Sequence, residues 1–295
     1  MKLATFEKDG RQCVGVVVAD RIVPLGHASM LDFIGKGAAA LDEAREAAQA
    51  PGDRGLALSS VTLLAPIPRP AKNVFCVGRN YKLHIEEGAR ANNIPVKFPL
   101  VPEFFTKPPT AVIGTYADIR LPSVTQKLDY EVELACVISR TGRDIPAANA
   151  GEYIFGFTVL NDITARDLQR GHGQWFKGKA LDGSCPTGPW IVTADAFDAR
   201  GDQRIWLTVN GEKRQDSVIS DMLFDCAQII EHLSAGLTLE AGDIITTGTP
   251  SGVGMGLDPQ IWLKNGDVIE AGIEGIGSII NTVRSPMRMP QWNES

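Results

Sequence analysis

Short apolar runs separated by turn residues follow one another along most of the chain, and this pattern predicts a protein built mainly of β-strands. In the first 60 or so residues the strand-like runs are Lys2–Phe6, Cys13–Val18 and Arg21–Pro24. Asp9-Gly10 and Ala19-Asp20 supply turn residues between them, and the Ala- and Glu-rich stretch Leu41–Ala50 predicts a helix. We therefore expect a small N-terminal α/β module.

A proline-rich stretch separates this module from the rest of the chain. Pro66, Pro68 and Pro70 alternate with other residues, which disfavours a helix and removes every second amide donor. We place a domain boundary here, with a small N-terminal domain at residues 1–65 and a larger domain at residues 70–288.

The larger domain is expected to be mostly β with some helices, an α+β fold. Its strand-like runs are Val74–Val77, Tyr130–Ile138, Phe155–Leu160, Trp190–Val192, Ile205–Val209, Asp243–Thr247 and Val268–Ile273. Asn210-Gly211 and Asn265-Gly266 are hairpin signals. Apolar residues at helical spacing predict one longer helix at Asp221–Ala235.

Composition narrows the class of protein. The 295 residues include 29 Lys and Arg against 35 Asp and Glu, a formal net charge of −6, and contain no basic stretch of the kind that binds nucleic acid or anionic lipid. Apolar residues make up 44%, as in a globular protein, but no run is long enough for a membrane span. Five cysteines without a Cys-x-x-Cys pair argue against a disulfide framework or a zinc cluster. We expect a cytoplasmic protein.

Two glutamates stand near the start of the most informative run, Asp129–Ile138. In a strand, Glu131 and Glu133 project from one face, about 6.6 Å apart along the chain. Asp162 follows the next run, Phe155–Leu160. Three carboxylates with no His or Cys nearby suit Mg²⁺, Mn²⁺ or Ca²⁺ better than zinc. Taken alone, the two glutamates are more typical of the solvated face of an edge strand.

A histidine and a glutamate share one side of a short helix predicted between Asn80, as N-cap, and Gly88, as the residue after the C-cap. His84 and Glu87 are three residues apart, so the carboxylate can orient the imidazole as a general base. The alternative is a surface histidine with an incidental neighbour.

Five blocks in the same order resemble the fumarylacetoacetate hydrolase family, including its acylpyruvase and 2-hydroxyhepta-2,4-diene-1,7-dioate isomerase members. The blocks are Gly78–Glu87, Asp129–Leu134, Asn161–Gln169, Lys177–Pro189 and Gly242–Pro250. The resemblance covers about residues 70–284. It implies a catalytic domain of mixed, rolled β-sheets and a homodimer, and it favours the metal and general-base interpretations of the motifs above.

The resemblance also implies a set of site residues. It implies one divalent cation bound by Glu131, Glu133 and Asp162, with Mg²⁺ as the first choice and Mn²⁺ and Ca²⁺ as alternatives. The implied catalytic residues are His84 and Glu87 on a lid, Lys179 and Gln169. The implied substrate-binding residues are Arg79, Tyr81, Arg166 and Thr249. Candidates to bind a second carboxylate are Arg79, Arg90, Arg166 and Lys107, the alternative for each being an ordinary surface or structural cation. Trp175 and Phe176 are expected to pack in the core rather than wall the pocket.

The implied substrate is a small 2-oxo acid. The leading hypothesis is hydrolysis of a carbon–carbon bond in a 2,4-dioxo acid, of acylpyruvate or fumarylpyruvate type, with His84 activating water and pyruvate released. The alternative is decarboxylation or isomerisation of a 2-oxo or 2-hydroxy-dienoic acid, of oxaloacetate or hydroxymuconate type, at the same cation. A third hypothesis is a non-catalytic scaffold with a structural ion.

Overall fold

The N-terminal strands form the meander that the turn residues predict. In the computed structural model, which describes residues 1–50 and 52–285, β1 (Lys2–Lys8), β2 (Arg11–Val18) and β3 (Arg21–Leu25) pair antiparallel. Asp9 and Gly10 both have positive φ, the backbone conformation that a tight hairpin turn requires. The module also contains α1 (Met30–Gly35), α2 (Ala38–Gln49), β4 (Leu56–Ala57) and β5 (Thr62–Leu63).

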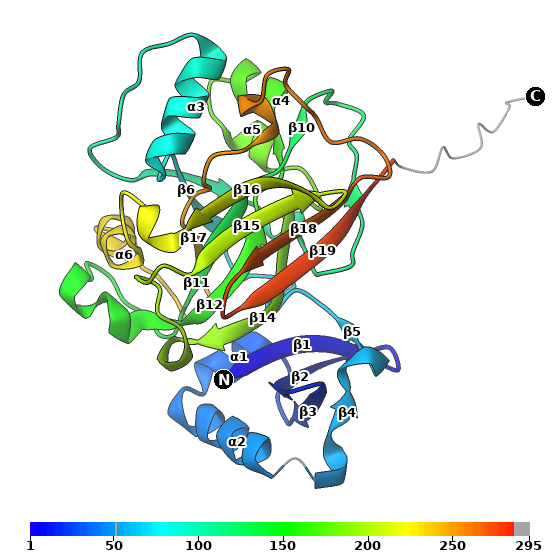
Figure 1. The fold of residues 1–295 in the computed structure, drawn as a ribbon. Coiled ribbons are helices and arrows are strands. Elements are labelled where there is room, and N and C mark those ends of the chain that lie inside the picture. The colour runs from blue at the N-terminus through cyan, green and yellow to red at the C-terminus, as the bar shows by residue number, and fades with distance from the viewer. Residues whose placement is uncertain (51, 286–295) are drawn as a thin grey trace, which may run out of the picture.

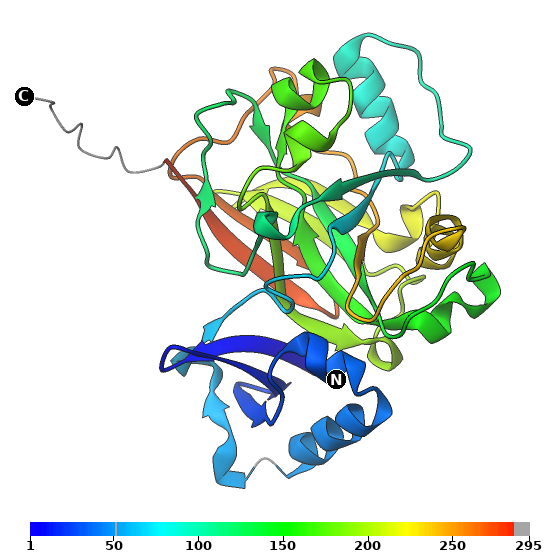
Figure 2. The ribbon, with the colours of Figure 1, turned by 180° about the vertical axis from the view of Figure 1, so that it is seen from behind.

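The N-terminal strands continue the main sheet of the larger part of the chain. β1 pairs antiparallel with β14 (Cys185–Thr193), so the module lies at one end of the molecule against the larger part (Figure 1, Figure 2). One buried cluster includes Val16, Phe33 and Ala44 of the module together with Val137 and Ile191 of the larger part. The domain boundary itself stays a prediction, and residues 286–288 of the predicted larger domain lie outside the described residues.

The main sheet has twelve strands and contains the strand that bears the glutamates. The other strands of its larger part are β6 (Val74–Gly78), β7 (Glu103–Lys107), β8 (Val112–Ile113), β11 (Val132–Ile138), β12 (Ile154–Asn161) and β17 (Ile244–Thr246). β11 lies between β12 and β17, with its residues buried on both faces. A strand in this position has no solvated face, so the edge-strand alternative for Glu131 and Glu133 is wrong.

A second sheet of five strands packs over β11 and β12 (Figure 1). Its members are β9 (Ile119–Arg120), β15 (Arg204–Val209), β16 (Glu212–Val218), β18 (Val268–Ile273) and β19 (Gly277–Arg284). Asn210 and Gly211 form the predicted hairpin turn between β15 and β16, whereas Asn265-Gly266 does not join two paired strands. A small pair, β10 (Leu128–Asp129) and β13 (Thr164–Ala165), flanks the sheets.

The core between the two sheets is apolar and closed at one side by α6 (Cys226–Ser234). This helix begins five residues later than predicted, because Asp225 forms a capping box with Gln228. Short 3₁₀ segments lie at Gly52–Arg54, Leu58–Ser60, Pro109–Ala111, Ala147–Tyr153, Ala194–Ala196, Ile219–Asp221 and Gly254–Gly256.

Three helices gather at the end of the molecule opposite the N-terminal module: α3 (Lys82–Asn92), α4 (Arg166–Gly171) and α5 (Phe176–Lys179) (Figure 1, Figure 2). The predicted limits of α3 are wrong at both ends. The side chain of Asn80 bonds to the backbone of Phe224 and Thr247 instead of capping the helix, and the helix continues through Gly88 to a left-handed Asn93.

The predicted class, mostly β with some helices and a small N-terminal module, is confirmed. Parallel pairs between β6 and β17, β8 and β14, and β9 and β19 make the sheets mixed. The longest described helix has 12 residues, and none of the helices in the described ranges is long and apolar enough to cross a bilayer.

Candidate metal and substrate site

The pairing of β11 with β12 brings the three predicted carboxylates together. Val132 at the start of β11 pairs with Asn161 at the end of β12, and the Asp162 amide donates to the Glu131 carbonyl at 2.8 Å. Each of Glu131, Glu133 and Asp162 can offer an oxygen, and these oxygens lie within 4.8 Å of one another. All three side chains are buried, so the cluster forms a compact all-oxygen donor set.

Three buried cations surround the cluster. Lys179 Nζ donates to Glu131 Oε2 and, at 2.7 Å, to Asp162 Oδ2. Arg166 donates through Nη2 to Glu131 Oε1 at 2.5 Å. Lys107, which has no exposed surface, donates to Asp162 Oδ1 at 2.7 Å and to the backbone carbonyls of Ile163 and Lys179.

The placement of Lys107 has a direct consequence for the predicted substrate contacts. Its ammonium group is enclosed by protein acceptors and lies outside the set of described residues that line the cavity. The interpretation of Lys107 as a partner for a second substrate carboxylate is therefore wrong. Its contacts instead hold the Asp162 carboxylate and the backbone of Lys179 in place.

A close backbone approach positions Lys179. Gly178 packs against α4 so tightly that a Cβ there would lie 2.5 Å from the Gln169 amide and 2.6 Å from the Ala165 carbonyl oxygen. A larger residue would push α5 away from α4. Glycine at this position therefore sets the depth at which Lys179 enters the cluster.

The charges of the cluster shift the pKa values of its members in opposite directions. Burial acts to raise the pKa of Glu131, but the nearby charges of Arg166 and Lys179 outweigh it and hold that pKa well below its usual range. Burial, with the negative charges of Asp162 and Glu131, raises the pKa of Glu133 to about 8. Burial acts to lower the pKa of Lys179, but Asp162 and Glu131 outweigh it and raise that pKa. The site thus carries more negative charge than its own cations neutralise.

The segment after β17 covers the cluster. The Gly248 amide donates to Glu133 Oε2 at 2.9 Å. The Thr249 hydroxyl donates to the Val132 carbonyl at 2.9 Å and accepts from Gln215 Nε2 at 2.7 Å. Thr249 lines the cavity, but its proton is used within the protein, so binding a substrate carboxylate would require it to release Val132.

The predicted His–Glu pair is present on α3. His84 Nδ1 lies 3.1 Å from Glu87 Oε2, and Glu87 Oε1 accepts from the Gly252 amide at 2.9 Å. A Cβ at Gly256 would lie 2.1 Å from the Glu87 carboxyl carbon, so only glycine there lets α3 approach. Glu87 therefore both orients the imidazole and joins α3 to the segment that covers the cluster.

These groups line a cavity of about 820 Å³, a size suited to a small-molecule ligand. The predicted site residues on its wall are Arg79, His84, Glu131, Glu133, Arg166, Gln169, Lys179 and Thr249. Other predicted residues in the described chain lie off the wall: Glu87 and Asp162 are buried behind it, Tyr81 is only 2% exposed within the fold, and Arg90 is exposed on α3. Trp175 lines the cavity and Phe176 is 47% exposed, so the expectation that both pack in the core is wrong.

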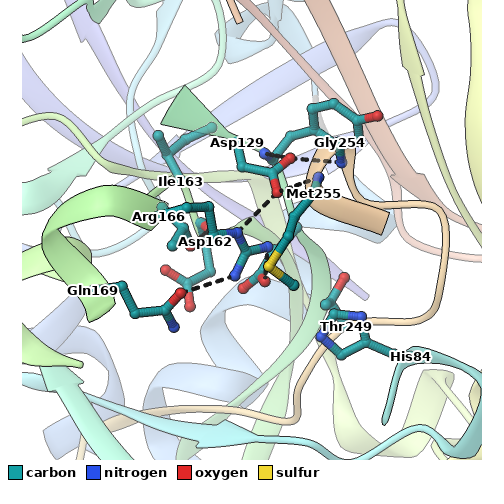
Figure 3. A network of polar contacts seen from close by, with 12 residues as sticks. His84, Asp129, Asp162, Ile163, Arg166, Gln169, Thr249, Gly254 and Met255 are labelled. Atoms are coloured by element: carbon teal, nitrogen blue, oxygen red, sulfur yellow. Dashed lines mark hydrogen bonds and ion pairs between the residues drawn. The ribbon is translucent and has the colours of Figure 1, made fainter. Parts of the chain in front are cut away.

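Asp129 links the cavity wall to the cluster and had no predicted role. Its carboxylate accepts from the amides of Tyr130, Gly254 and Met255 and, at 2.8 Å, from Arg166 Nε (Figure 3). The same guanidinium contacts Glu131 and donates to Gln169 Oε1 at 3.2 Å. Asp129 therefore fixes Arg166 between the carboxylate cluster and Gln169.

A buried cluster of three carboxylates, of which Glu131 and Glu133 line the same cavity as His84, is consistent with the divalent-metal site of an enzyme. Residues 73–284 match the family described as fumarylacetoacetate (FAA) hydrolase C-terminal. The chain belongs to the fumarylacetoacetate hydrolase family, as the sequence blocks predict.

Two curated relatives have the same printed activity. The chain is 42% identical to oxaloacetate tautomerase YisK of Bacillus subtilis, over 96% of this chain and 100% of the relative. It is also 42% identical to the mitochondrial oxaloacetate tautomerase FAHD2A of Bos taurus, over 91% of this chain and 84% of the relative. Neither relative is named as a hydrolase of carbon–carbon bonds.

Solved structures with the same fold have more varied names. A fumarylacetoacetate hydrolase from Exiguobacterium antarcticum superposes with a TM-score of 0.81 at 43% identity, covering 97% of this chain and 100% of that one. A 2-hydroxyhepta-2,4-diene-1,7-dioate isomerase from Mycobacterium marinum superposes with a TM-score of 0.76 at 33% identity, covering 98% of this chain and 100% of that one. Maleylpyruvate hydrolase from Sphingobium sp. SYK-6 superposes with a TM-score of 0.79 at 29% identity, covering 97% of this chain and 100% of that one. The fold thus serves both isomerases and hydrolases.

Proposed function

We propose that the protein is a divalent-metal-dependent tautomerase that interconverts the keto and enol forms of a 2-oxo dicarboxylic acid of the oxaloacetate type. The observation that supports this most is a buried carboxylate cluster whose Glu131 and Glu133 line the same cavity as His84, which is hydrogen-bonded to Glu87. The activity printed for two relatives, at 42% identity, favours isomerisation over the hydrolysis that the sequence motifs suggested.

The donor set fits a hard divalent cation. Glu131, Glu133 and Asp162 offer only carboxylate oxygens, which Mg²⁺, Mn²⁺ and Ca²⁺ prefer. The raised pKa of Glu133 marks uncompensated negative charge that a cation would neutralise. We propose Mg²⁺. When bound, the ion would act as a Lewis acid that polarises the 2-oxo carbonyl.

Tautomerisation then requires a proton to move between carbon and oxygen. Because Glu87 lies at Nδ1 of His84, the other ring nitrogen, Nε2, which has no hydrogen-bond partner among the described residues, would take a proton from C3 of the acid. As that C–H bond breaks, a double bond forms between C2 and C3 and the carbonyl electron pair moves to oxygen. The Lys179 ammonium stabilises the negative oxygen, which then receives the proton that His84 took from C3, so that the enol forms and His84 returns to its neutral state.

Hydrolysis of a 2,4-dioxo acid is the second candidate. The same His84 that would take a proton from C3 could take one from water, and maleylpyruvate hydrolase has the same fold. Products separate the candidates: tautomerisation leaves the mass unchanged, decarboxylation releases CO₂, and hydrolysis yields two acids. The homodimer implied by the family is likewise a proposal, and light scattering of the purified protein tests it.

The deciding experiment follows the enol absorbance of oxaloacetate with Mg²⁺-loaded protein, alongside mass analysis of oxaloacetate and of a 2,4-dioxo acid. Acceleration of enol–keto exchange above the metal-only rate, with no new acid formed, supports the proposal. His84→Asn is expected to lower kcat by about 10²-fold or more, the usual contribution of a general base. His172→Asn, which alters an exposed histidine at the end of α4, is the matched control.

Glu131→Gln separates the role of the ion from that of the histidine. This variant should lose Mg²⁺ binding and exchange together, whereas His84→Asn should lose exchange and retain Mg²⁺ binding. Full exchange activity after the metal is stripped, or cleavage of the 2,4-dioxo acid as the only reaction, would refute the tautomerase proposal.

A further inference from the structure

The substrate class proposed above has a second carboxylate, and the cluster accounts for only one end of the molecule. A 2-oxo acid that bound the ion through its C1 carboxylate and its 2-oxo oxygen would leave its C4 carboxylate to bind elsewhere on the cavity wall. The wall has five basic residues: Arg79, Lys97, Arg166, Arg170 and Lys179. The partners of each decide which one is available.

Three of these cations are already neutralised by protein carboxylates. Arg166 and Lys179 are bound to the cluster. Arg79 is paired with Glu103 at 3.0 Å and also donates to the Lys97 carbonyl. A substrate carboxylate would have to compete with an existing ion pair at each of these positions.

Arg170 differs from these three cations in the kind of partner that it has. Its Nη2 lies 2.9 Å from the thioether sulfur of Met255, a weak and uncharged acceptor, and within the described residues no carboxylate is at salt-bridge distance from it. The Met255 amide is held by Asp129 at 3.1 Å. Met255 therefore restrains the guanidinium without neutralising its charge.

The position of Arg170 on α4 matches the size of the acid. Arg166 and Arg170 are four residues apart, so they share one face of the helix with their Cβ atoms about 5–6 Å apart. Arg166 is 3% exposed and contacts Glu131, whereas Arg170 is exposed. The face therefore runs from the cluster toward the cavity mouth over one turn, comparable to the length of a four-carbon chain.

Lys97 is the other wall cation with no carboxylate at salt-bridge distance in the described chain. It lies in the exposed segment after α3, outside any helix or strand. Its ammonium is a strongly hydrated point charge on a flexible stem, whereas a guanidinium binds a carboxylate through two parallel hydrogen bonds. These differences favour Arg170 over Lys97 as the residue that binds the distal carboxylate.

We propose that Arg170 binds the distal carboxylate and makes the site selective for dicarboxylic 2-oxo acids. This inference rests on the proposed function for its substrate class. It assigns to one residue a preference that neither the cation nor the His–Glu pair can supply, because both act on the 2-oxo acid end that all such substrates share.

The test compares two acids that differ only at C4: oxaloacetate, and 2-oxobutanoate with a methyl group in place of the distal carboxylate. Dissociation constants are measured by calorimetry on Mg²⁺-loaded protein with freshly dissolved acids. Exchange is measured as enol absorbance for oxaloacetate and as deuterium incorporation at C3 for 2-oxobutanoate. The variants are Arg170→Met and Arg170→Lys, with Arg90→Met, an exposed arginine off the cavity wall, as the matched control.

Arg170→Met is expected to raise the dissociation constant and KM for oxaloacetate about 10- to 100-fold, the effect of losing a charge-assisted bidentate contact. The values for 2-oxobutanoate and for the Arg90→Met control should stay unchanged, and Arg170→Lys should restore part of the preference. Equal weakening of both acids, no weakening of either, or loss of the preference in Lys97→Met instead would overturn the inference.

The binding arm keeps this inference separate from the proposed function. If the wild-type protein prefers oxaloacetate through Arg170 but accelerates no exchange, the tautomerase proposal fails and the inference stands. If exchange is fast and Arg170→Met leaves the preference intact, the inference fails and the tautomerase proposal stands.

Discussion

Replacing Asp129 by asparagine tests whether this residue holds the site together. The carboxylate has no exposed surface and accepts four hydrogen bonds, two at each oxygen. Oδ1 accepts from the Tyr130 and Gly254 amides, and Oδ2 from the Met255 amide and Arg166 Nε. An asparagine has one acceptor oxygen, so in either orientation its NH₂ group faces two buried donors.

The expected cost follows from this count. Hydrogen bonds to a charged group contribute about 1.5–3 kcal/mol each, and breaking a buried ion pair costs about 3–5 kcal/mol. Since two donors lose their acceptor, we expect Asp129→Asn to lower the free energy of unfolding by about 3–5 kcal/mol. Because Arg166 also loses the charge that positions it beside Glu131, turnover should fall even at temperatures where the variant is folded.

Urea unfolding of the wild type, Asp129→Asn and Asp20→Asn measures the effect, with the exposed turn residue Asp20 as the matched control. The control should stay within about 0.5 kcal/mol of the wild type. A loss below about 1 kcal/mol in Asp129→Asn would show that the four contacts are replaceable and would refute the reasoning.

Three other changes test separate parts of the molecule. Lys107→Met should cost about 3–5 kcal/mol in urea unfolding, because it removes one of the two buried cations bound to Asp162 and leaves Lys179 as the other; unchanged stability would contradict this. The pKa of Glu133 rises from 4.5 to about 8 on folding, so metal-free protein should lose stability as pH rises between these values, and Mg²⁺ uptake there should release a proton measurable by calorimetry. Arg204 helps lower the pKa of Asp216 to about 2, so Asp216→Asn should cost at most about 1 kcal/mol above pH 3.8, and the difference should vanish as pH falls to 2.

The metal cluster could be predicted because its signal is local. The alternation of Glu131 and Glu133 within one apolar run places both on one face, and Asp162 ends the strand that pairs with it. The hairpin at Asn210-Gly211 could also be predicted from a local signal, because this residue pair favours a tight turn. A period within ten residues places the two glutamates on one face, and a turn preference decides the hairpin, whereas the pairing that adds Asp162 joins runs about thirty residues apart.

The supporting residues could not be predicted, since their partners are far away in sequence. Lys107 and Asp162 are 55 residues apart, and Asp129 reaches an amide 125 residues away. The sequence around each shows only a single charge beside apolar residues. Nothing in that local pattern separates a buried, fully bonded side chain from a solvated one.

Among the strands that escaped prediction, β16 and β19 have polar residues at buried positions. In β16 the buried Gln215 donates to Thr249 and the Pro250 carbonyl and accepts from the Val132 amide. In β19 the buried Asn281 donates to the carbonyls of Gly114 and Ala117. A buried amide that bonds to a distant backbone breaks the apolar alternation on which strand prediction depends.

The charge balance of the site explains why it can select an anionic chelator. Four buried carboxylates, Asp129, Glu131, Glu133 and Asp162, face three buried cations, Lys107, Arg166 and Lys179. With every group ionised, the network has one unit of negative charge, which repels a 2-oxo acid and favours a proton on Glu133. A divalent cation reverses the sign, leaving one positive unit that the C1 carboxylate can neutralise. Because the distal carboxylate then has no counter-charge in the cluster, a dicarboxylic substrate needs a further cation on the wall, and Arg170 meets that requirement.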